Sequence, residues 1–332
     1  MKKILVFAPH ADDEILGCGG YLIHESKKGS NIRICIATIG SCTIHIVTGS
    51  TDLKEKLYMN VLSLFDGMSC GQLALQKANV NYDNYFASEI KKHAIKCTQR
   101  NFPNTKQIGD VRDIKASDLP EIDLLIGGSP CQDFSIGSKD RTGLNGEKSS
   151  LFYEYLRLLK ELKPKYFLLE NVEMTSENKK SLSDYLGVEP VFIDSIDFSF
   201  QTRKRYYWTN IPIEKWIPKK INFQDYKDTD YEYCKKFKVN RTPSRIIMWE
   251  KKCPNVTNRE YINCLTVKQD RWNNAGLVAF DDFCRYLTRR ELELAQTVPS
   301  GYTDCVSIRQ AEDLLGDGWT VDVIAHIFKA LA

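Results

Sequence analysis

The chain has 332 residues, of which 42% are hydrophobic and 27% charged, a composition typical of a globular protein. Its formal net charge of +3 does not by itself indicate a nucleic-acid partner, and no apolar run approaches the length of a membrane span. The eleven cysteines form no Cys-x-x-Cys pair, which argues against a disulfide framework or a cysteine-rich zinc site and favours a reducing compartment.

The first 58 residues are patterned differently from the rest of the chain. Strand-like runs at 4–7 and 32–36 predict a single strand–helix–strand piece within residues 1–40. Residues 41–58 are rich in Ser, Thr and Lys and weakly patterned, so we predict a linker there.

From Asn60 onward, strand-like and helix-like segments alternate. Strands are predicted at 61–65, 85–88, 123–126 and 166–169, and helices at 72–78, 92–101 and 151–162. This alternation predicts an α/β fold with a Rossmann-like, mostly parallel sheet, whose ligands bind at the carboxyl ends of the strands. The rhythm stops near residue 210, and helical patterns return at 288–296 and 321–331.

The segment after residue 210 is the most basic part of the chain. Between Arg203 and Lys252 there are 14 Lys and Arg against 6 Asp and Glu, with several aromatic residues among them. Two interpretations are open, a solvated basic face and a surface that contacts phosphates. The block 211–282 is rich in Lys, Asn, aromatics and Pro and predicts a separate small domain.

Polar groups follow three successive predicted strands. The first strand runs into the turn Phe65-Asp66-Gly67, the second ends at Glu89-Ile90, and the third at Asp110-Val111. A carboxylate at the second strand end can accept hydrogen bonds from both ribose hydroxyls, and one at the third can meet an adenine amino group. We therefore predict a nucleoside cofactor site there, against the alternative that these residues are helix caps and packing turns.

Reactive side chains follow the next two strands. Pro130-Cys131 lies in a Gly- and Pro-containing loop after the fourth strand, and Glu170 ends the fifth, so the two are expected near each other. The alternative for Cys131 is a buried structural thiol. Arg203 and Arg205 are two residues apart and would face the same side of a strand.

The order of these motifs resembles the DNA (cytosine-5) methyltransferases, in particular small phage and bacterial members. The sequence reads Phe-x-Gly-x-x-x-Gly, Ser-Glu-Ile, Gly-Asp-Val, Pro-Cys-Gln, Glu-Asn-Val, Gln-x-Arg-x-Arg, Arg-Glu and Gly-x-Gly-Trp across about residues 60–332. The resemblance implies S-adenosylmethionine as cofactor, no metal, double-stranded DNA as partner, no membrane and no obligate protein partner. It places the protein in the cytoplasm of a bacterial or phage-infected cell, in DNA methylation or restriction–modification.

The same resemblance implies a role for each catalytic residue. Cys131 would add to carbon 6 of a flipped-out cytosine, and Glu170 would hold or protonate ring nitrogen 3. Arg203 and Arg205 would position the base and help to keep Cys131 anionic.

The resemblance also implies the cofactor site and the domains. The cofactor residues would be Phe65, Asp66, Gly67, Glu89, Ile90, Asp110, Val111, Pro130 and Trp319. The domains would be a catalytic and cofactor-binding domain at 59–210, a target-recognition domain at 211–282, and a return to the catalytic domain at 283–332. Two positions depart from the family's pattern: Ser69 stands where Gly is commoner, and Asp317 where Asn is often found.

Residues 1–40 carry a second, shorter resemblance. The run Ala8-Pro9-His10-Ala11-Asp12-Asp13-Glu14 is similar to the PIG-L/LmbE-type zinc deacetylases, in which His10 and Asp13 would bind zinc and Asp12 would be the base. The third ligand of that family, a distant His, has no evident counterpart, and two protein ligands make a poor zinc site. We therefore predict a fused remnant, with a bifunctional deacetylase as the alternative.

Two further alternatives concern the methyltransferase part. A branch of the fold that shares Pro-Cys and Glu-Asn-Val methylates a cytosine in tRNA, although the roughly 70-residue recognition block favours DNA. A catalytically silent DNA-binding relative would have lost the nucleophile, whereas this chain keeps Cys131 together with Glu170, Arg203 and Arg205.

Overall fold

The computed structural model describes residues 3–8, 31–38, 41–47, 59–129, 150–240, 242–244, 246–247, 255–269, 275–280 and 282–332. The chain forms two compact units, Met1–Leu57 and Tyr58–Ala332. None of the described helices is long and apolar enough to cross a membrane.

The first unit contains a three-stranded sheet in the order β1-β2-β3. β1 (Lys3–Ala8) is parallel to β2 (Asn31–Thr38), and β3 (Ser41–Val47) is antiparallel to β2. The prediction of a linker from residue 41 is therefore wrong for 41–47. Four of those seven residues are the β-branched Thr, Ile and Val, whose preference for strands outweighs the polar character of the segment as a whole. The residues that resemble a zinc site, His10, Asp12 and Asp13, lie outside the described residues.

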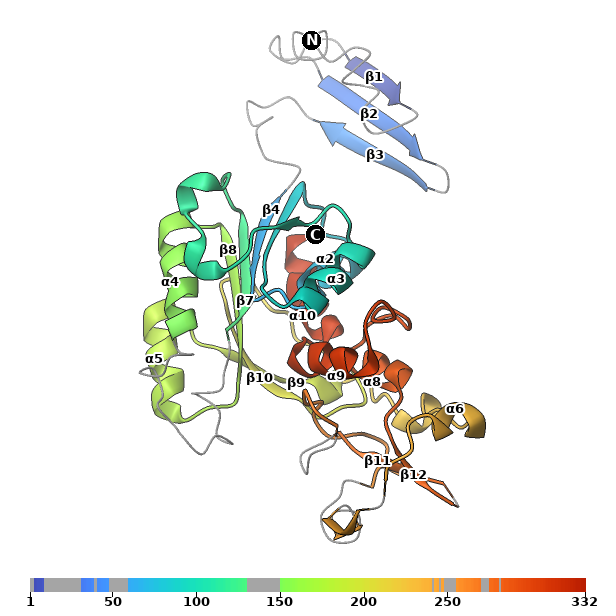
Figure 1. The fold of residues 1–332 in the computed structure, drawn as a ribbon. Coiled ribbons are helices and arrows are strands. Elements are labelled where there is room, and N and C mark those ends of the chain that lie inside the picture. The colour runs from blue at the N-terminus through green and yellow to red at the C-terminus, as the bar shows by residue number, and fades with distance from the viewer. Residues whose placement is uncertain are drawn as a thin grey trace. The chain divides into compact units, whose positions relative to one another are not determined.

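The second unit is built on a seven-stranded sheet in the order β6-β5-β4-β7-β8-β10-β9 (Figure 1). Its strands are β4 (Asn60–Leu64), β5 (Asn84–Ser88), β6 (Lys106–Gln107), β7 (Leu124–Gly128), β8 (Tyr166–Val172), β9 (Val191–Asp194) and β10 (Lys204–Thr209). The five strands from β6 to β8 are parallel, whereas β10 runs antiparallel to both β8 and β9. The predicted α/β fold with a mostly parallel sheet is confirmed.

Helices cover both faces of this sheet (Figure 1). One face carries α2 (Cys70–Lys77), α3 (Lys92–Asn101) and α10 (Val321–Phe328), and the other carries α4 (Ser150–Leu162) and α5 (Ser176–Leu186). Alternate residues of β4 serve the two cores: Val61 packs with the first set and Leu62 with the second, and both are fully buried. All five residues of β4 are buried for this reason, as expected for a sheet covered on both sides.

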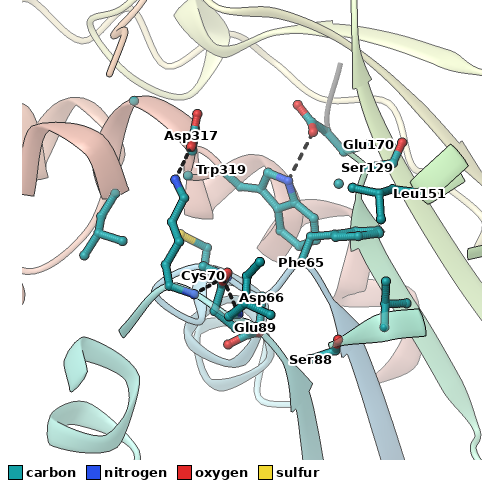
Figure 2. A pocket seen from close by; sticks show the side chains of 18 of the residues that line it. Phe65, Asp66, Cys70, Ser88, Glu89, Ser129, Leu151, Glu170, Asp317 and Trp319 are labelled. Carbon is teal, nitrogen blue, oxygen red and sulfur yellow. Dashed lines mark hydrogen bonds and ion pairs between the residues drawn. The ribbon is translucent and has the colours of Figure 1, made fainter. Parts of the chain in front are cut away.

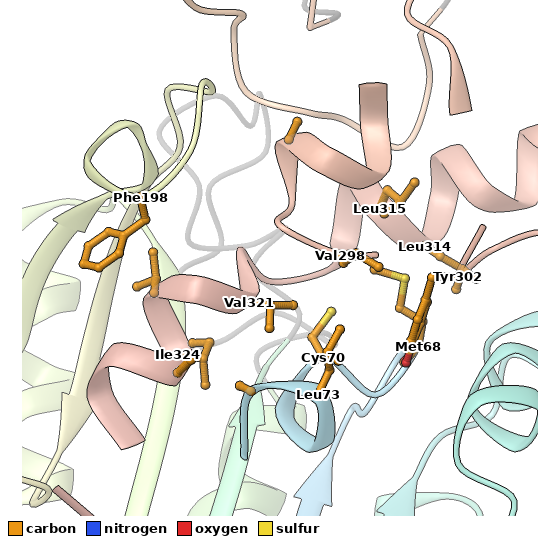
Figure 3. Packing of buried hydrophobic residues seen from close by; sticks show 14 of the residues in the cluster. Met68, Cys70, Leu73, Phe198, Val298, Tyr302, Leu314, Leu315, Val321 and Ile324 are labelled. Atoms are coloured by element: carbon orange, nitrogen blue, oxygen red, sulfur yellow. The ribbon is translucent and has the colours of Figure 1, made fainter. Parts of the chain in front are cut away.

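The C-terminal helices close the first core. α9 (Ile308–Asp317) and α10 bring Leu314, Val321 and Ile324 against Met68 and Leu73 of the β4–α2 region (Figure 3). Each such aliphatic side chain, fully buried, contributes about 1.5–3 kcal/mol to folding. The chain end is thereby fixed beside the first strand of the sheet, as the predicted C-terminal return requires.

The segment after β10 contains smaller elements. They are α6 (Tyr231–Lys235), β11 (Leu277–Ala279), β12 (Cys284–Tyr286) and α8 (Arg289–Ala295), with short 3₁₀ turns at Phe223–Asp225 and Lys329–Leu331. Three further 3₁₀ turns lie before β10, at Val111–Asp113, Ala116–Asp118 and Ser195–Asp197. A fully buried ion pair joins Arg285 of β12 to Glu291 of α8 through two contacts of 2.7 and 2.8 Å. The boundary predicted at 211–282 stays a prediction, since Tyr58–Ala332 forms one compact unit.

Candidate active site

A pocket of about 730 Å³ opens at the carboxyl ends of β4, β5, β7 and β8 (Figure 2). Every predicted site residue that the structure describes lines it: Phe65, Asp66, Gly67, Glu89, Ile90, Asp110, Val111, Glu170, Arg203, Arg205 and Trp319. Pro130 and Cys131 lie outside the described residues, but the chain reaches Cys131 two residues after Ser129, which lines the pocket. Segments far apart in the sequence therefore meet around one cavity.

The turn between β4 and α2 forms the floor of the pocket. Phe65, Gly67 and Ser69 all have left-handed backbone conformations, with φ of 58°, 61° and 66°. Ser69, at the position where the family pattern has Gly, is fully buried, and its hydroxyl donates to the side-chain oxygen of Gln72 at 3.1 Å. The serine thus adopts the backbone conformation that favours glycine while its side chain faces away from the pocket lining.

Glu89 is held by three backbone N–H groups. Its Oε2 accepts from Gly67 at 2.8 Å, and its Oε1 accepts from Ile90 at 2.7 Å and Lys91 at 2.8 Å. Charge-assisted bonds of this kind fix a carboxylate in place. Each carboxylate oxygen has two lone pairs, so Oε1 is fully used and Oε2 keeps one lone pair for a hydroxyl group of a ligand.

Asp66 is a buried carboxyl group beside Glu89. Its Oδ1 accepts from the Tyr85 hydroxyl at 2.8 Å, whereas Oδ2 has no hydrogen-bond partner among the described residues. Burial raises the pKa of Asp66 to about 6, although the nearby hydroxyls of Ser63, Tyr85 and Ser69 oppose the rise. A buried, unpaired carboxylate oxygen on a pocket wall is a natural acceptor for a donor or cation on a ligand.

Asp110 also lines the pocket and is already paired. Arg112 contacts its carboxylate at 2.5 Å and also donates its backbone N–H at 3.0 Å. These hydrogen bonds lower the pKa of Asp110 to about 2. The sequence analysis did not single out Arg112, which follows Asp110 by two residues and lines the same pocket.

Each carboxylate oxygen of Glu170 has a side-chain partner in the pocket. The guanidinium Nε of Arg205 lies 2.8 Å from Oε1. The indole Nε1–H of Trp319 donates to Oε2 at 3.2 Å (Figure 2). Glu170 and Arg205 come from the antiparallel strands β8 and β10, whereas Trp319 lies between α9 and α10. The sequence predicted that these residues share a site, but not that Trp319 contacts Glu170.

Arg203 is engaged differently from Arg205. It lies just before β10, is almost fully buried, and donates to the carbonyls of Gly318 at 2.9 Å and Leu265 at 3.3 Å. Its guanidinium therefore ties the loop at Leu265 and the turn at Gly318 to the sheet, while its side chain lines the pocket.

An ion-pair cluster bridges the rim of the pocket. Lys91 Nζ lies 2.8 Å from Asp317 and 3.0 Å from Asp313, and His93 Nε2 lies 2.7 Å from Asp313. A carboxylate at position 317, unlike the asparagine often found in the family, gives Lys91 a charged partner. The sequence offered no signal for these contacts, because the partners are more than 200 residues apart.

The remaining lining residues were not among the predicted site residues, although several of them belong to the quoted motifs. They are Cys70, Ser88, Lys91, Arg112, Gly128, Ser129, Leu151, Val172, Leu314, Gly316, Asp317 and Gly318. Gly128 and Ser129 belong to the loop that the sequence analysis did quote, so their position next to Cys131 could have identified them. Within the described part of the chain, no cluster of three or more His, Cys, Asp or Glu residues is placed to hold a metal ion.

Part of the chain is similar in sequence to known methyltransferases. Residues 59–188 match the family described as C-5 cytosine-specific DNA methylase. The chain is 42% identical over 117 residues to the orphan methyltransferase M.SPRI of Bacillus phage SPR, covering 35% of this chain and 26% of that protein. It is 37% identical over 131 residues to the type II methyltransferase M.NgoBV of Neisseria gonorrhoeae, covering 38% of this chain and 31% of that protein.

Solved structures share the fold over a longer span. The Entamoeba histolytica methyltransferase EhMeth superposes with a TM-score of 0.68 at 18% identity, covering 82% of this chain and 98% of that chain. The S. pombe Dnmt2 methyltransferase superposes with a TM-score of 0.67 at 19% identity, with the same coverage of both chains.

Proposed function

Residues 59–188 belong to the C-5 cytosine-specific DNA methylase family, and from this premise we propose that the chain transfers a methyl group from S-adenosylmethionine to carbon 5 of cytosine in double-stranded DNA. One observation carries the proposal: a single pocket joins three cofactor-suited strand ends to Glu170 and Arg205, beside the start of the loop that bears Cys131. Parallel strands bring their carboxyl ends to one edge of a sheet, and there Asp66 keeps a buried carboxylate oxygen without a hydrogen-bond partner among the described residues, which a helix cap or packing turn would not explain.

The pocket fits the proposed cofactor in charge and in unfilled hydrogen-bonding capacity. S-adenosylmethionine carries an ammonium and a sulfonium, and Asp66, Glu89 and Asp110 line the pocket with carboxylates. Oδ2 of Asp66, which has no partner among the described residues, would accept from the ammonium, and the remaining lone pair on Glu89 Oε2 would accept from a ribose hydroxyl. When bound, the cofactor supplies an electrophilic methyl group.

Apolar residues complete the proposed cofactor site. Phe65 and Val111 line the same cavity, and Ile90 does so with 66% of its side chain exposed. An exposed aliphatic side chain at a pocket wall gives a flat ring such as adenine a surface to cover. Asp110, held by Arg112, would accept from the adenine amino group.

The protein's part in the chemistry would centre on Cys131 and Glu170. The Cys131 thiolate forms a bond to carbon 6 of the base, which makes carbon 5 nucleophilic. Glu170, in its protonated form and oriented by Arg205, would donate its proton to ring nitrogen 3 and so neutralise the negative charge that develops there as Cys131 adds; the proton returns to Glu170 when the ring is restored. After methylation, loss of the proton on carbon 5 expels Cys131 and restores the ring. Because a base stacked in a duplex cannot reach such a pocket, the cytosine would have to be flipped out.

Methyl transfer from radiolabelled S-adenosylmethionine tests the proposal. Purified protein is incubated separately with plasmid DNA and with total tRNA, and the modified positions are mapped by bisulfite sequencing. We expect label in DNA, at cytosines of a defined sequence context. Label in tRNA alone would replace DNA by RNA as the substrate, and no label in either would refute the proposed activity.

A further inference from the structure

We propose that Trp319 is a positioning residue, which holds Glu170 for the target base and couples it to the cofactor pocket. The inference rests on the proposed function of that pocket. Trp319 is in contact with both parts of the site: its ring lines the cavity, and its indole N–H donates to Glu170 Oε2 at 3.2 Å (Figure 2).

The backbone on either side of Trp319 is fixed by buried hydrogen bonds. The carbonyl of Gly318 accepts from Arg203 at 2.9 Å and from the side chain of Gln296 at 3.0 Å. The hydroxyl of Thr320 donates to the side-chain oxygen of Gln296 at 2.8 Å. Because Gly318 and Thr320 are both held by hydrogen bonds, the backbone fixes the position of the Trp319 indole, which does not depend on Glu170.

Gly128 lies against this contact and leaves no room for a side chain. A Cβ atom at Gly128 would lie 2.9 Å from both Trp319 Nε1 and Glu170 Oε2. Real Cβ atoms essentially never approach other heavy atoms so closely. The end of β7 therefore carries a glycine at the point where the indole and the carboxylate meet.

The two donors to Glu170 together fix the orientation of its carboxylate. Arg205 occupies Oε1 and Trp319 occupies Oε2, so rotation of the carboxylate would break one of the two contacts. A lone pair remains on each oxygen and can accept from the exocyclic amino group of the base, or from ring nitrogen 3 while that nitrogen carries the proton. Without the indole N–H, Oε2 would be free and the carboxylate would turn about its bond to the side chain, which misaligns it for ring nitrogen 3. A ligand in the cofactor pocket that contacts the indole ring would therefore also affect the hydrogen bond between Trp319 and Glu170.

Trp319→Phe removes the N–H donor while it keeps an aromatic ring, and Trp216→Phe is its matched control. The indole of Trp216 also donates to a carboxylate, Asp197, at 2.9 Å, but Trp216 does not line the pocket. We expect kcat for DNA methylation to fall about 10- to 100-fold in Trp319→Phe, the loss typical of a hydrogen bond to a charged group. Because Phe keeps an aromatic ring in the pocket, the Kd for S-adenosylhomocysteine should rise by a smaller factor than kcat falls, whereas Trp216→Phe should leave both quantities within about twofold.

The indole N–H resonances of ¹⁵N-labelled protein give a readout that does not depend on turnover. The Trp319 resonance should shift when Glu170→Gln replaces the carboxylate by a neutral amide, and again when S-adenosylhomocysteine is added to the wild type. The Trp216 resonance should move in neither case. A Trp319 resonance unmoved by Glu170→Gln, or equal kcat values in the two tryptophan variants, would overturn the inference. A wild type without methyl transfer would refute the proposed function, and the resonances would still test the contact.

Discussion

Asp66 offers the sharpest quantitative prediction, because its carboxyl group is buried with one oxygen unpaired. Burial raises its pKa from 3.8 to about 6 in the folded protein. Since one pKa unit corresponds to about 1.4 kcal/mol, the ionised group lowers the free energy of unfolding by about 3 kcal/mol. For a folded-state pKa that is raised, the stabilising contribution is complete below about pH 3.8 and is lost as the pH rises through about 6.

The substitution Asp66→Asn removes this ionisation. The amide oxygen can still accept from the Tyr85 hydroxyl, while the NH₂ group takes the place of the unpaired Oδ2. An unpaired buried donor costs about 1–2 kcal/mol, but it does so equally at every pH. Relative to the wild type, the variant should therefore gain about 2 kcal/mol of unfolding free energy between about pH 4.5 and about pH 8.

Urea unfolding followed by circular dichroism at both pH values measures this change. Asp110→Asn is the control, since Arg112 lowers the pKa of Asp110 to about 2 and its carboxylate stays ionised over the whole range. The difference between Asp110→Asn and wild type should not change with pH. If the difference between Asp66→Asn and wild type is equally flat, Asp66 does not titrate as a buried group and the reasoning fails.

Three further predictions concern the cofactor site and the first unit. Glu89→Ala should weaken S-adenosylmethionine binding by about 1.5–3 kcal/mol, because charged-group hydrogen bonds are lost; calorimetry that shows unchanged affinity would mean that the ribose lies elsewhere. Lys91→Met removes the ion pairs with Asp313 and Asp317 at the rim of the pocket. These pairs are partly exposed and are worth about 0.5–1 kcal/mol. S-adenosylhomocysteine should therefore dissociate a few-fold faster in stopped-flow experiments at low salt. If Lys92→Met speeds dissociation of S-adenosylhomocysteine equally, the ion pairs of Lys91 are not the cause. A chain that starts at Met59 should keep its specific methylation rate within about threefold, since Tyr58–Ala332 is a compact unit of its own; inactive but folded protein would show that the first unit takes part in the reaction.

The sheet and several helices were predicted from the sequence because their signals are local. Buried apolar runs marked β4, β5, β7 and β8, and the bounds predicted for α3 agree with the structure. α9 was missed, although Ser307 and Gln310 form a capping box that marks its start in the sequence. α5 was also missed, because Leu182, Tyr185 and Leu186 are too few apolar residues to show a helical period clearly.

The gathering of the site was predicted, but its internal contacts were not. Parallel strands end at the same edge of a sheet, so Asp66, Glu89 and Glu170 could be expected around one cavity. The contacts of Arg203 with the Gly318 carbonyl and of Trp319 with Glu170 join residues more than 100 positions apart. Sequence spacing carries no information on such pairs, since they depend on how the C-terminal helices pack on the sheet.

Covalent trapping tests the central claim of the account, that Cys131 attacks the cytosine ring. Duplex DNA with 5-fluorocytosine at the mapped target is incubated with the protein and S-adenosylmethionine, and complexes that survive denaturation are digested and analysed by mass spectrometry. Because carbon 5 then has no proton to lose, the thioether bond should persist in the wild type on the peptide that contains Cys131, and Cys131→Ser should give no adduct. A denaturation-resistant adduct in Cys131→Ser, or methyl transfer by the wild type to ordinary DNA without any adduct on the fluorinated DNA, would contradict the account.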